Sequence, residues 1–215
     1  PATPHKQPNE IRYPAAGTKN AVLGLARISI AGKKEAINWD NDSFEYLISV
    51  SWQKDCAALI TVADRAQQNF VTYSLADSGL KIVHEVTDHE FVEVIPGQPR
   101  WHDSEIVSVI DNRQTDTREL QLAGKAITPQ GFQVMSVIDV TPEYIDVVAT
   151  SDAVSRDVVR VGYDGSLTEL AQGGVAGATS TTGELQILIE SRLDTHSRTY
   201  QLRRGAKTEH YFDSL

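Results

Sequence analysis

Cysteine is almost absent from this sequence, and its scarcity excludes a disulfide-stabilised fold. Cys56 is the one cysteine among 215 residues, and it stands at the start of an apolar run where a small buried hydrophobe is expected. An internal disulfide needs two cysteines, so the fold has to rest on an ordinary apolar core. With 40% hydrophobic and 23% charged residues, the composition is that of a globular protein.

The chain also lacks long apolar runs and a surplus of basic residues. No segment approaches the roughly 18 apolar residues that a membrane-spanning helix needs. Acidic residues outnumber basic ones by 29 to 20, a net charge of −9, which disfavours a nucleic-acid partner. The chain begins at Pro1 without a signal segment and holds one methionine, Met135, which suggests a piece of a longer protein. A cytoplasmic and an exported parent protein both fit.

Motifs for nucleophilic catalysis are missing as well. An α/β-hydrolase carries its serine in a Gly-x-Ser-x-Gly turn, and no such pentapeptide occurs. The stretch Asp164-Gly165-Ser166 is typical of a hairpin turn between two strands. The sequence indicates no histidine partner that could activate the thiol of Cys56. We therefore expect no nucleophile in this chain.

No feature points to a cofactor or a metal ion. The glycine-rich residues 173–177 precede a strand pattern instead of the helix start that a phosphate-binding loop requires. A small cluster of His84, Glu85, His89 and Glu90 gives no shared ligand face, and zinc sites usually need three or four converging ligands. A solvated loop is the simpler interpretation, and no cofactor is expected.

What the sequence does contain is a strand pattern that recurs about four times. Apolar strands begin at Ala57, Glu105, Glu143 and Glu184, at spacings of 48, 38 and 41 residues. Each is followed by a polar turn, an alternating strand, a tight turn and a short strand. A period of roughly 40–50 residues built from short strands is typical of propeller blades. The pattern therefore predicts an all-β partial propeller of about four to five four-stranded blades.

Turn chemistry and composition indicate the boundaries. Glycine in the pairs Ala123-Gly124 and Asp164-Gly165 accepts the positive φ of tight hairpins. No segment shows a sustained period of 3.6 residues, so little helix is expected. Residues 1–10, rich in proline and polar side chains, are predicted to form a linker or lead-in, and residues 11–215 the propeller fragment.

Two tryptophans occupy similar places in the pattern. Trp52 and Trp101 each precede a short polar turn with an aspartate, and then an apolar strand that we interpret as the innermost of its unit. Aromatic side chains at that junction are well placed to seal the space between adjacent blades. Core packing is predicted for both, in preference to stacking on a carbohydrate or a nucleobase.

An arginine recurs at one position of the unit. Arg118, Arg156 and Arg198 lie 13, 13 and 14 residues after the starts of their units, and Asn69 occupies the corresponding place in the first unit. Recurrence at a fixed position favours a structural role, such as bonding turn carbonyls or pairing with a carboxylate of the neighbouring blade.

Two stretches resemble the dipeptidyl peptidase IV family. Residues 12–21 are similar to the family's Tyr-Pro-Lys-Ala-Gly-x-x-Asn-Pro stretch, with Ala15 in place of the usual lysine. Trp52, Asp55 and residues 64–69 resemble its Trp-x-x-Asp and Arg-x-Gln-Asn blade. The repeats extend the likeness over nearly the whole chain, although residues 29–38 are short where an arm contributes to dimer contacts in the family.

The resemblance implies a section of the N-terminal eight-bladed propeller of a bacterial serine exopeptidase of the prolyl oligopeptidase clan. Such enzymes release dipeptides from peptides with proline or alanine at the second position. Their propeller covers an α/β-hydrolase catalytic domain and restricts entry. The family's paired glutamates lie upstream of the part matched here, and its catalytic residues lie downstream. The implied partners are the catalytic domain of the same parent chain and a peptide substrate, and this chain alone is not expected to be an enzyme.

One binding residue of the family is expected within the chain. A propeller arginine that lines the pocket for the second substrate residue falls near residues 110–120, and Arg118 is the best match after a shift of one residue. The repeat position shared with Arg156 and Arg198 leaves a structural role for Arg118 open.

Other functions and states also stay open. The alternative function is a protein-interaction propeller, a scaffold without peptidase activity. An independent enzyme such as a glycosidase would need two converging carboxylates, which the sequence does not pair among its 29 acidic residues. Four or five blades cannot close a ring of eight, so unpaired edges and apolar faces predict either an open arc or self-association into a homo-oligomer.

Overall fold

The structure, a computed structural model, consists of β-strands joined by turns and loops. It describes residues 5, 17–171, 175–179, 185–192, 196–204 and 207–213. These residues form no helix, and hence none long and apolar enough to cross a membrane. The all-β prediction is confirmed. The lead-in predicted for residues 1–10 lies outside the described residues, apart from His5.

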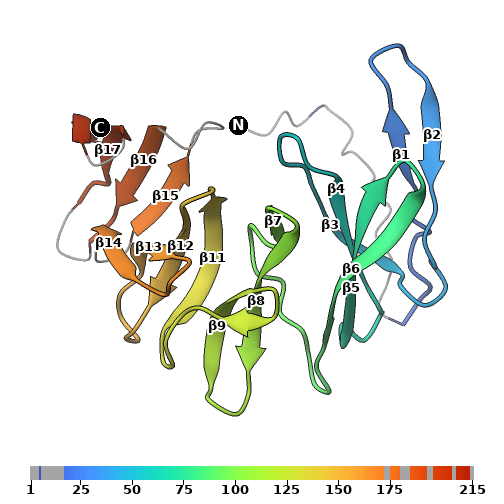
Figure 1. The fold of residues 1–215 in the computed structure, drawn as a ribbon, viewed down its shortest axis with the longest axis horizontal. Helices are drawn as coiled ribbons and strands as arrows, with labels where there is room; N and C mark the ends of the chain where they lie inside the picture. The colour runs from blue at the N-terminus through green and yellow to red at the C-terminus, as the bar shows by residue number, and fades with distance from the viewer. Residues whose placement is uncertain are drawn as a thin grey trace.

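Four sheets of four strands follow a two-stranded hairpin (Figure 1). The hairpin pairs β1 (Leu25–Ile28) with β2 (Lys34–Ile37). Blade 1 consists of β3 (Tyr46–Ser51), β4 (Ala58–Ala63), β5 (Asn69–Ala76) and β6 (Gly79–Thr87). Blade 2 consists of β7 (Arg100–His102), β8 (Glu105–Asn112), β9 (Thr117–Leu122) and β10 (Lys125–Ala126).

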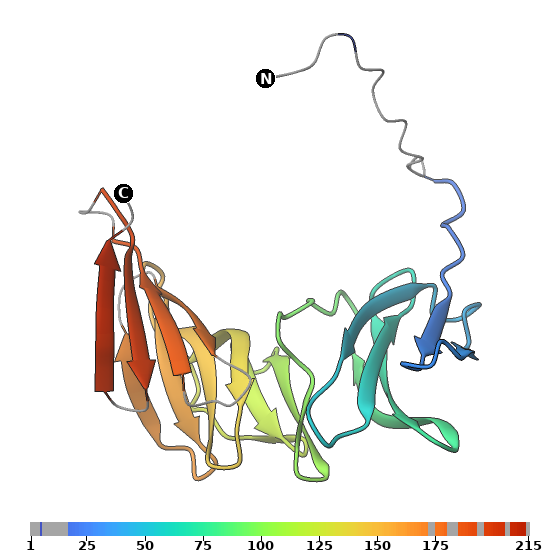
Figure 2. The ribbon, with the colours of Figure 1, turned by 90° about the horizontal axis from the view of Figure 1, so that it is seen from above.

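The remaining two sheets have the same make-up. Blade 3 consists of β11 (Gln133–Val140), β12 (Tyr144–Thr150), β13 (Asp157–Gly162) and β14 (Leu167–Ala171). Blade 4 consists of β15 (Val175–Thr179), β16 (Leu185–Glu190), β17 (Thr199–Arg204) and β18 (Lys207–Asp213). In every sheet the strand order follows the chain, and neighbours are antiparallel. The blades stand one after another along an open arc (Figure 2), so the partial propeller is confirmed.

The sequence repeat begins one strand late in each blade. Its apolar segments are β4, β8, β12 and β16, which are second in their sheets, so interpreting them as innermost strands was wrong. The pattern missed the first strands β7, β11 and β15. In β11, register shifts between Val134 and Ser136 and between Val137 and Asp139 interrupt the alternation of apolar residues. A bulged strand of this kind does not show the period that strand recognition relies on.

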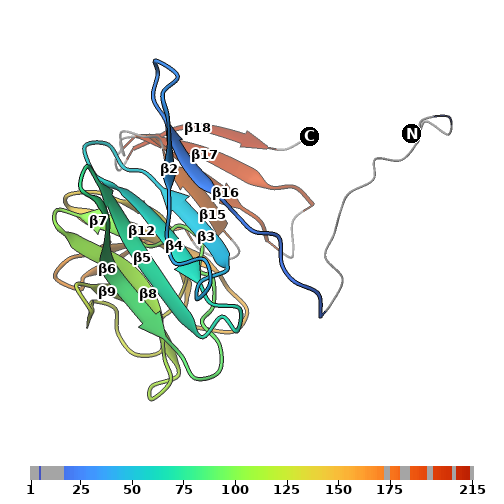
Figure 3. The ribbon, with the colours of Figure 1, turned by 90° about the vertical axis from the view of Figure 1, so that its right-hand side faces the viewer.

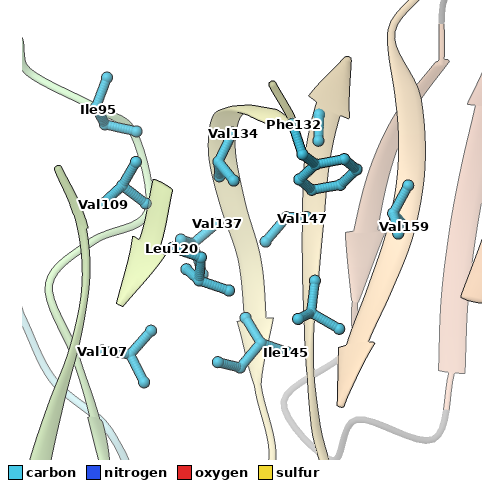
Figure 4. Packing of buried hydrophobic residues seen from close by; sticks show 12 residues of the cluster. Ile95, Val107, Val109, Leu120, Phe132, Val134, Val137, Ile145, Val147 and Val159 are labelled. Atoms are coloured by element: carbon cyan, nitrogen blue, oxygen red, sulfur yellow. The ribbon is translucent and has the colours of Figure 1, made fainter. Parts of the chain in front are cut away.

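The main core lies between blades 2 and 3 (Figure 4). Its buried side chains come from the facing strands of both sheets and from the segments that join them: Ile95, Val107, Val109, Leu120, Phe132, Val134, Val137, Ile145, Val147, Ala149, Val159 and Val161. Each fully buried Val or Leu contributes about 1.5–3 kcal/mol. Leu188 of β16 packs with Val158 and Ala171 and continues the core into blade 4.

The β1–β2 hairpin covers the outer face of blade 1. Ile37 of β2 packs with Ile60, Val62 and Val71. Figure 3, in which this end of the molecule faces the viewer, shows the hairpin beside the strands of blade 1. Because this face and the opposite one are both covered, all six residues of β4 are buried. This double burial explains its continuous apolar run.

The two tryptophans differ, and the prediction of core packing for Trp52 was wrong. Trp52 is 70% exposed because β3 ends at Ser51 and leaves it in the following turn. Trp101 is the central residue of β7 and is half-buried. Its Nε1 donates a hydrogen bond to the carbonyl oxygen of Ala57 at 2.8 Å, and its backbone N donates to Gln53 Oε1 at 2.6 Å. Trp101 therefore does join blade 2 to blade 1.

The hairpin turns follow the expected chemistry. Ala123 and Gly124 both have positive φ, at 50° and 76°, as a two-residue turn between β9 and β10 requires. Gly165 has φ of 84° in the turn between β13 and β14. The short connections keep successive strands adjacent, which gives each blade its simple order.

Candidate functional site

A hollow of about 460 Å³ lies at one end of blade 2. Its walls come from the linker between β6 and β7, the turn between β8 and β9 with the strand ends beside it, and the first residue of β11. The lining residues are Phe91, Glu93, Asp111, Asn112, Arg113, Asp116, Thr117, Arg118 and Gln133. The linker between blades 1 and 2, blade 2 itself and the first strand of blade 3 thus border this space, which we call the blade-2 hollow.

Arg118 lies in this hollow between two carboxylates. It is the register partner of Asp111, and its Nε donates to Asp111 Oδ1 at 2.8 Å. Its Nη2 donates to Glu93 Oε2 at 3.3 Å, and the side chain is 19% exposed. Burial lowers the pKa of Arg118, but the two carboxylates outweigh it and raise the pKa above its ordinary value. Arg118 is therefore a fixed, charged donor.

Gln133 fastens the turn of blade 2 to the edge of blade 3. Its Oε1 accepts a hydrogen bond from the backbone N of Arg118 at 2.7 Å, and its Nε2 donates to the carbonyl oxygen of Asp116 at 2.7 Å. Thr117 Oγ1 accepts from the backbone N of Gly131 at 3.0 Å. These bonds hold the backbone beneath Arg118 in place from the side of blade 3.

Arg113 anchors the opposite wall of the hollow, which is the linker between β6 and β7. Its guanidinium contacts both oxygens of Asp88, at 2.6 and 2.9 Å. The hydrogen bond from Arg113 holds the pKa of the Asp88 carboxyl well below its usual range, and two backbone N–H groups add to this effect. The pair stays ionised at neutral pH.

The lining favours binding over bond-breaking chemistry. It offers three carboxylates, from Glu93, Asp111 and Asp116, and two guanidinium groups. Among the described residues, Thr117 supplies the one hydroxyl of the lining, and it already donates to the carbonyl oxygen of Thr115 at 3.1 Å. The same described lining includes no cysteine or histidine. Such a surface can hold peptide carbonyls and charged groups.

The comparisons with known proteins decide the family. The family model of the dipeptidyl peptidase IV (DPP IV) N-terminal region matches residues 1–157, more than half of the chain. The chain belongs to this family. No curated protein matches it.

A solved structure agrees with the DPP IV assignment at the level of the fold. The crystal structure of Porphyromonas gingivalis dipeptidyl peptidase 4 is similar to this chain, with a TM-score of 0.75 and 17% sequence identity. The match covers 94% of this chain and 31% of that one. The chain thus spans about a third of the length of that relative.

The two stretches that resemble the DPP IV family meet in space. Arg65 Nη2 donates to the carbonyl oxygen of Thr18 at 2.9 Å, which joins the second stretch to the first. Asp64 accepts hydrogen bonds from the backbone N of Gln68, from the backbone N of Asn69 and from Asn69 Nδ2, at 2.6–3.2 Å. These residues therefore fix a turn of blade 1. Residues 12–16 of the first stretch lie outside the described residues.

The recurring arginines do not share one environment. Arg118 lies in the hollow, whereas Arg156 and Arg198 are exposed at the corresponding turns. The sequence offered no sign of Glu93 or Asp88, because the linker has neither a repeat nor a strand period, and none of Arg113, which lies in the turn between β8 and β9. The substrate-binding role of Arg118 stays a prediction.

The histidine cluster is not a single solvated loop. The His89 side chain is 79% exposed, as expected, but His84 Nε2 is enclosed at the junction of blades 1 and 2. The His84 nitrogen has no hydrogen-bond partner among the described residues. Within the same residues, no three His, Cys, Asp or Glu side chains converge as a metal site would need.

Proposed function

We propose that this chain is the non-catalytic propeller portion of a DPP IV-like serine peptidase. In this proposal, a catalytic α/β-hydrolase domain of the same parent protein cleaves the peptide. The propeller gates access to it and contributes to the recognition of peptides with proline or alanine at the second position. Membership of the DPP IV N-terminal region family supports the assignment, and the propeller fold is consistent with it.

The single observation that carries the recognition role is the setting of Arg118. Two carboxylates fix its guanidinium through Nε and Nη2, and Nη1 has no hydrogen-bond partner among the described residues. A guanidinium that is held in place yet keeps donors unused can bind a peptide carbonyl with little loss of side-chain entropy. The hollow of about 460 Å³ offers room for a side chain of the substrate.

The test is Arg118→Ala in the full-length parent protein, assayed on dipeptidyl chromogenic substrates with proline or alanine at the second position. Loss of a charged hydrogen bond to substrate should lower kcat/KM about ten- to hundredfold. Arg156→Ala is the matched control, because Arg156 occupies the same repeat position in blade 3 and is exposed. Equal kcat/KM values for the two variants would contradict the proposal.

The isolated chain provides a second test. It should cleave none of these substrates, because no Gly-x-Ser-x-Gly nucleophile turn occurs in it. Turnover by the isolated chain that serine-protease inhibitors abolish would overturn the assignment. A full-length parent protein that is itself inactive would instead favour a protein-interaction scaffold.

A further inference from the structure

The linker between β6 and β7 passes from one apolar core to another. Val92 is buried with Ala63 and Phe70 of blade 1. Ile95, three residues later, belongs to the core between blades 2 and 3. Glu93, which bonds Arg118, lies between these two anchors. The linker therefore forms one wall of the blade-2 hollow and lies at the junction between blade 1 and blade 2.

That junction is held mainly by polar contacts. Among the described residues, no buried apolar cluster includes strand residues of both blade 1 and blade 2, whereas blades 2 and 3 share one. At one end of the junction, Gln53 exchanges hydrogen bonds of 2.9 and 2.6 Å with the backbone of Trp101. At the other end of the junction, Arg113 contacts Asp88 of the linker. Hydrogen bonds and ion pairs hold two segments of a protein at a fixed distance only where their geometry is directional.

The contact of Arg113 with Asp88 has that directional geometry. Its Nε and Nη2 lie 2.6 and 2.9 Å from the two carboxylate oxygens, a fork-to-fork pairing that only arginine can make. Asp88 Oδ1 also accepts hydrogen bonds from the backbone N of Glu90, at 2.8 Å, and of Phe91, at 3.1 Å. One carboxylate thus shapes the linker and ties it to the turn between β8 and β9.

We propose that Arg113 is a positioning residue for the blade-2 hollow. It holds the linker at a fixed distance from blade 2 through Asp88, and so places Phe91 and Glu93 against Arg118. Arg113 acts through its neighbours and not on the substrate. The inference rests on the proposed function, because it assigns a role within the same peptide-binding hollow.

The experiment compares Arg113→Ala, Arg113→Lys and Asp88→Asn in the full-length parent protein, with Arg118→Ala beside them. Arg27→Ala is the control, because the exposed cross-strand pair of Arg27 and Glu35 at 2.8 Å lies far from the hollow in the hairpin. Each test variant should raise KM for the dipeptidyl substrate about three- to tenfold and leave kcat within about twofold. Lysine should not restore KM, because its single nitrogen cannot make the two parallel hydrogen bonds that Nε and Nη2 of Arg113 make to Asp88.

Amide hydrogen exchange of the linker gives a readout that does not depend on activity. Residues 88–93 should exchange faster in Arg113→Ala and in Asp88→Asn, with the unfolding midpoint of the protein unchanged. The effects of Arg113→Ala and Asp88→Asn should not add in the double variant, because each single variant already removes the contact between Arg113 and Asp88. Unchanged exchange in the linker would overturn the inference, as would a fall in kcat together with a lowered unfolding midpoint.

The variants also separate this inference from the proposed function. If Arg118→Ala impairs KM and Arg113→Ala does not, the positioning role is wrong and the peptide-binding hollow stands. If Arg118→Ala has no effect, the recognition role proposed for the hollow is wrong. In that case faster linker exchange in Arg113→Ala still supports the positioning role, and unchanged exchange overturns it.

Discussion

The carboxylate of Asp146 on β12 accepts two hydrogen bonds from Arg160 on β13, at 2.9 Å from Nε and 3.0 Å from Nη2. Asp146 is fully buried, and its second oxygen also accepts a hydrogen bond from Gln186 Nε2 on β16. The guanidinium of Arg160 lies over the ring of Tyr144, 3.4 Å from its centroid. One buried carboxylate thus joins blade 3 to blade 4.

Replacing Asp146 with alanine should therefore lower the free energy of unfolding by about 3–5 kcal/mol. The change leaves a partly buried guanidinium and the Gln186 amide without their acceptor. Denaturant unfolding of the chain measures the loss. Asp111→Ala is the matched control, since it removes the register partner of Arg118 at an exposed position of blade 2. A loss no larger than that of the control would show that the buried pair does not hold the blades.

The strand content of the fold could be predicted because period-2 alternation and glycine turns are local signals. The segment before Asp146 and the turn at Gly165 both carried such signals in the sequence. The first strands of blades 2 to 4 could not be found in the same way. β7 has only three residues, and the bulges of β11 remove its alternation. A bulge depends on pairing with β12, which no local pattern records.

The candidate site was predictable only in part, for a related physical reason. Arg118 stands at a fixed place in the repeat, so the sequence could single it out. Its partner Glu93 is 25 residues away in an irregular linker, and Gln186 lies 40 residues from Asp146. Contacts between blades depend on how sheets stack, and stacking is set by the whole core and not by spacing along the chain.

The two tryptophans should respond differently to truncation. Trp101→Ala should lower the free energy of unfolding by about 3 kcal/mol, because it removes a half-buried ring. Trp101→Phe should lower it by about 1 kcal/mol, because the hydrogen bond to Ala57 is lost. Trp52→Ala should change it by less than about 1 kcal/mol, because Trp52 is 70% exposed. Denaturation midpoints that rank Trp52→Ala as the most harmful change would contradict this assignment.

His84 should make stability fall at mildly acidic pH. Burial lowers its pKa below the ordinary value of 6.5, although Glu85 raises it. The unfolded chain therefore binds the proton more readily, and the free energy of unfolding decreases as pH falls through about 6.5. His84→Gln should lose less stability than the unaltered chain between about pH 7.5 and about pH 5.5.

The control for this pH dependence is His89→Gln, because the His89 side chain is 79% exposed. Thermal unfolding at a series of pH values measures both variants. The stability of His89→Gln should change with pH as that of the unaltered chain does. If the stability of His84→Gln shows the same pH dependence, protonation of His84 is not what destabilises the fold at low pH.

Gly97 should tolerate no side chain, because backbone atoms of blade 3 occupy the space that a Cβ would need. It lies in the linker with φ of +82°, and a Cβ there would run into the carbonyl oxygen of Val137 on β11. The backbone N of Val137 donates to the carbonyl oxygen of Pro96 at 3.0 Å, which keeps the two segments in contact. Gly97→Ala should therefore lower the free energy of unfolding by about 3 kcal/mol or more.

Gly131 separates the effect of close approach from the effect of backbone conformation. Its φ of +81° is nearly the same as that of Gly97, yet a Cβ there would meet nothing within 4 Å. Gly131→Ala should cost only the left-handed conformation, about 1–2 kcal/mol. Denaturant unfolding of the two variants then gives the contribution of the contact with Val137 by difference. Equal losses would show that the linker can move away from β11 without penalty.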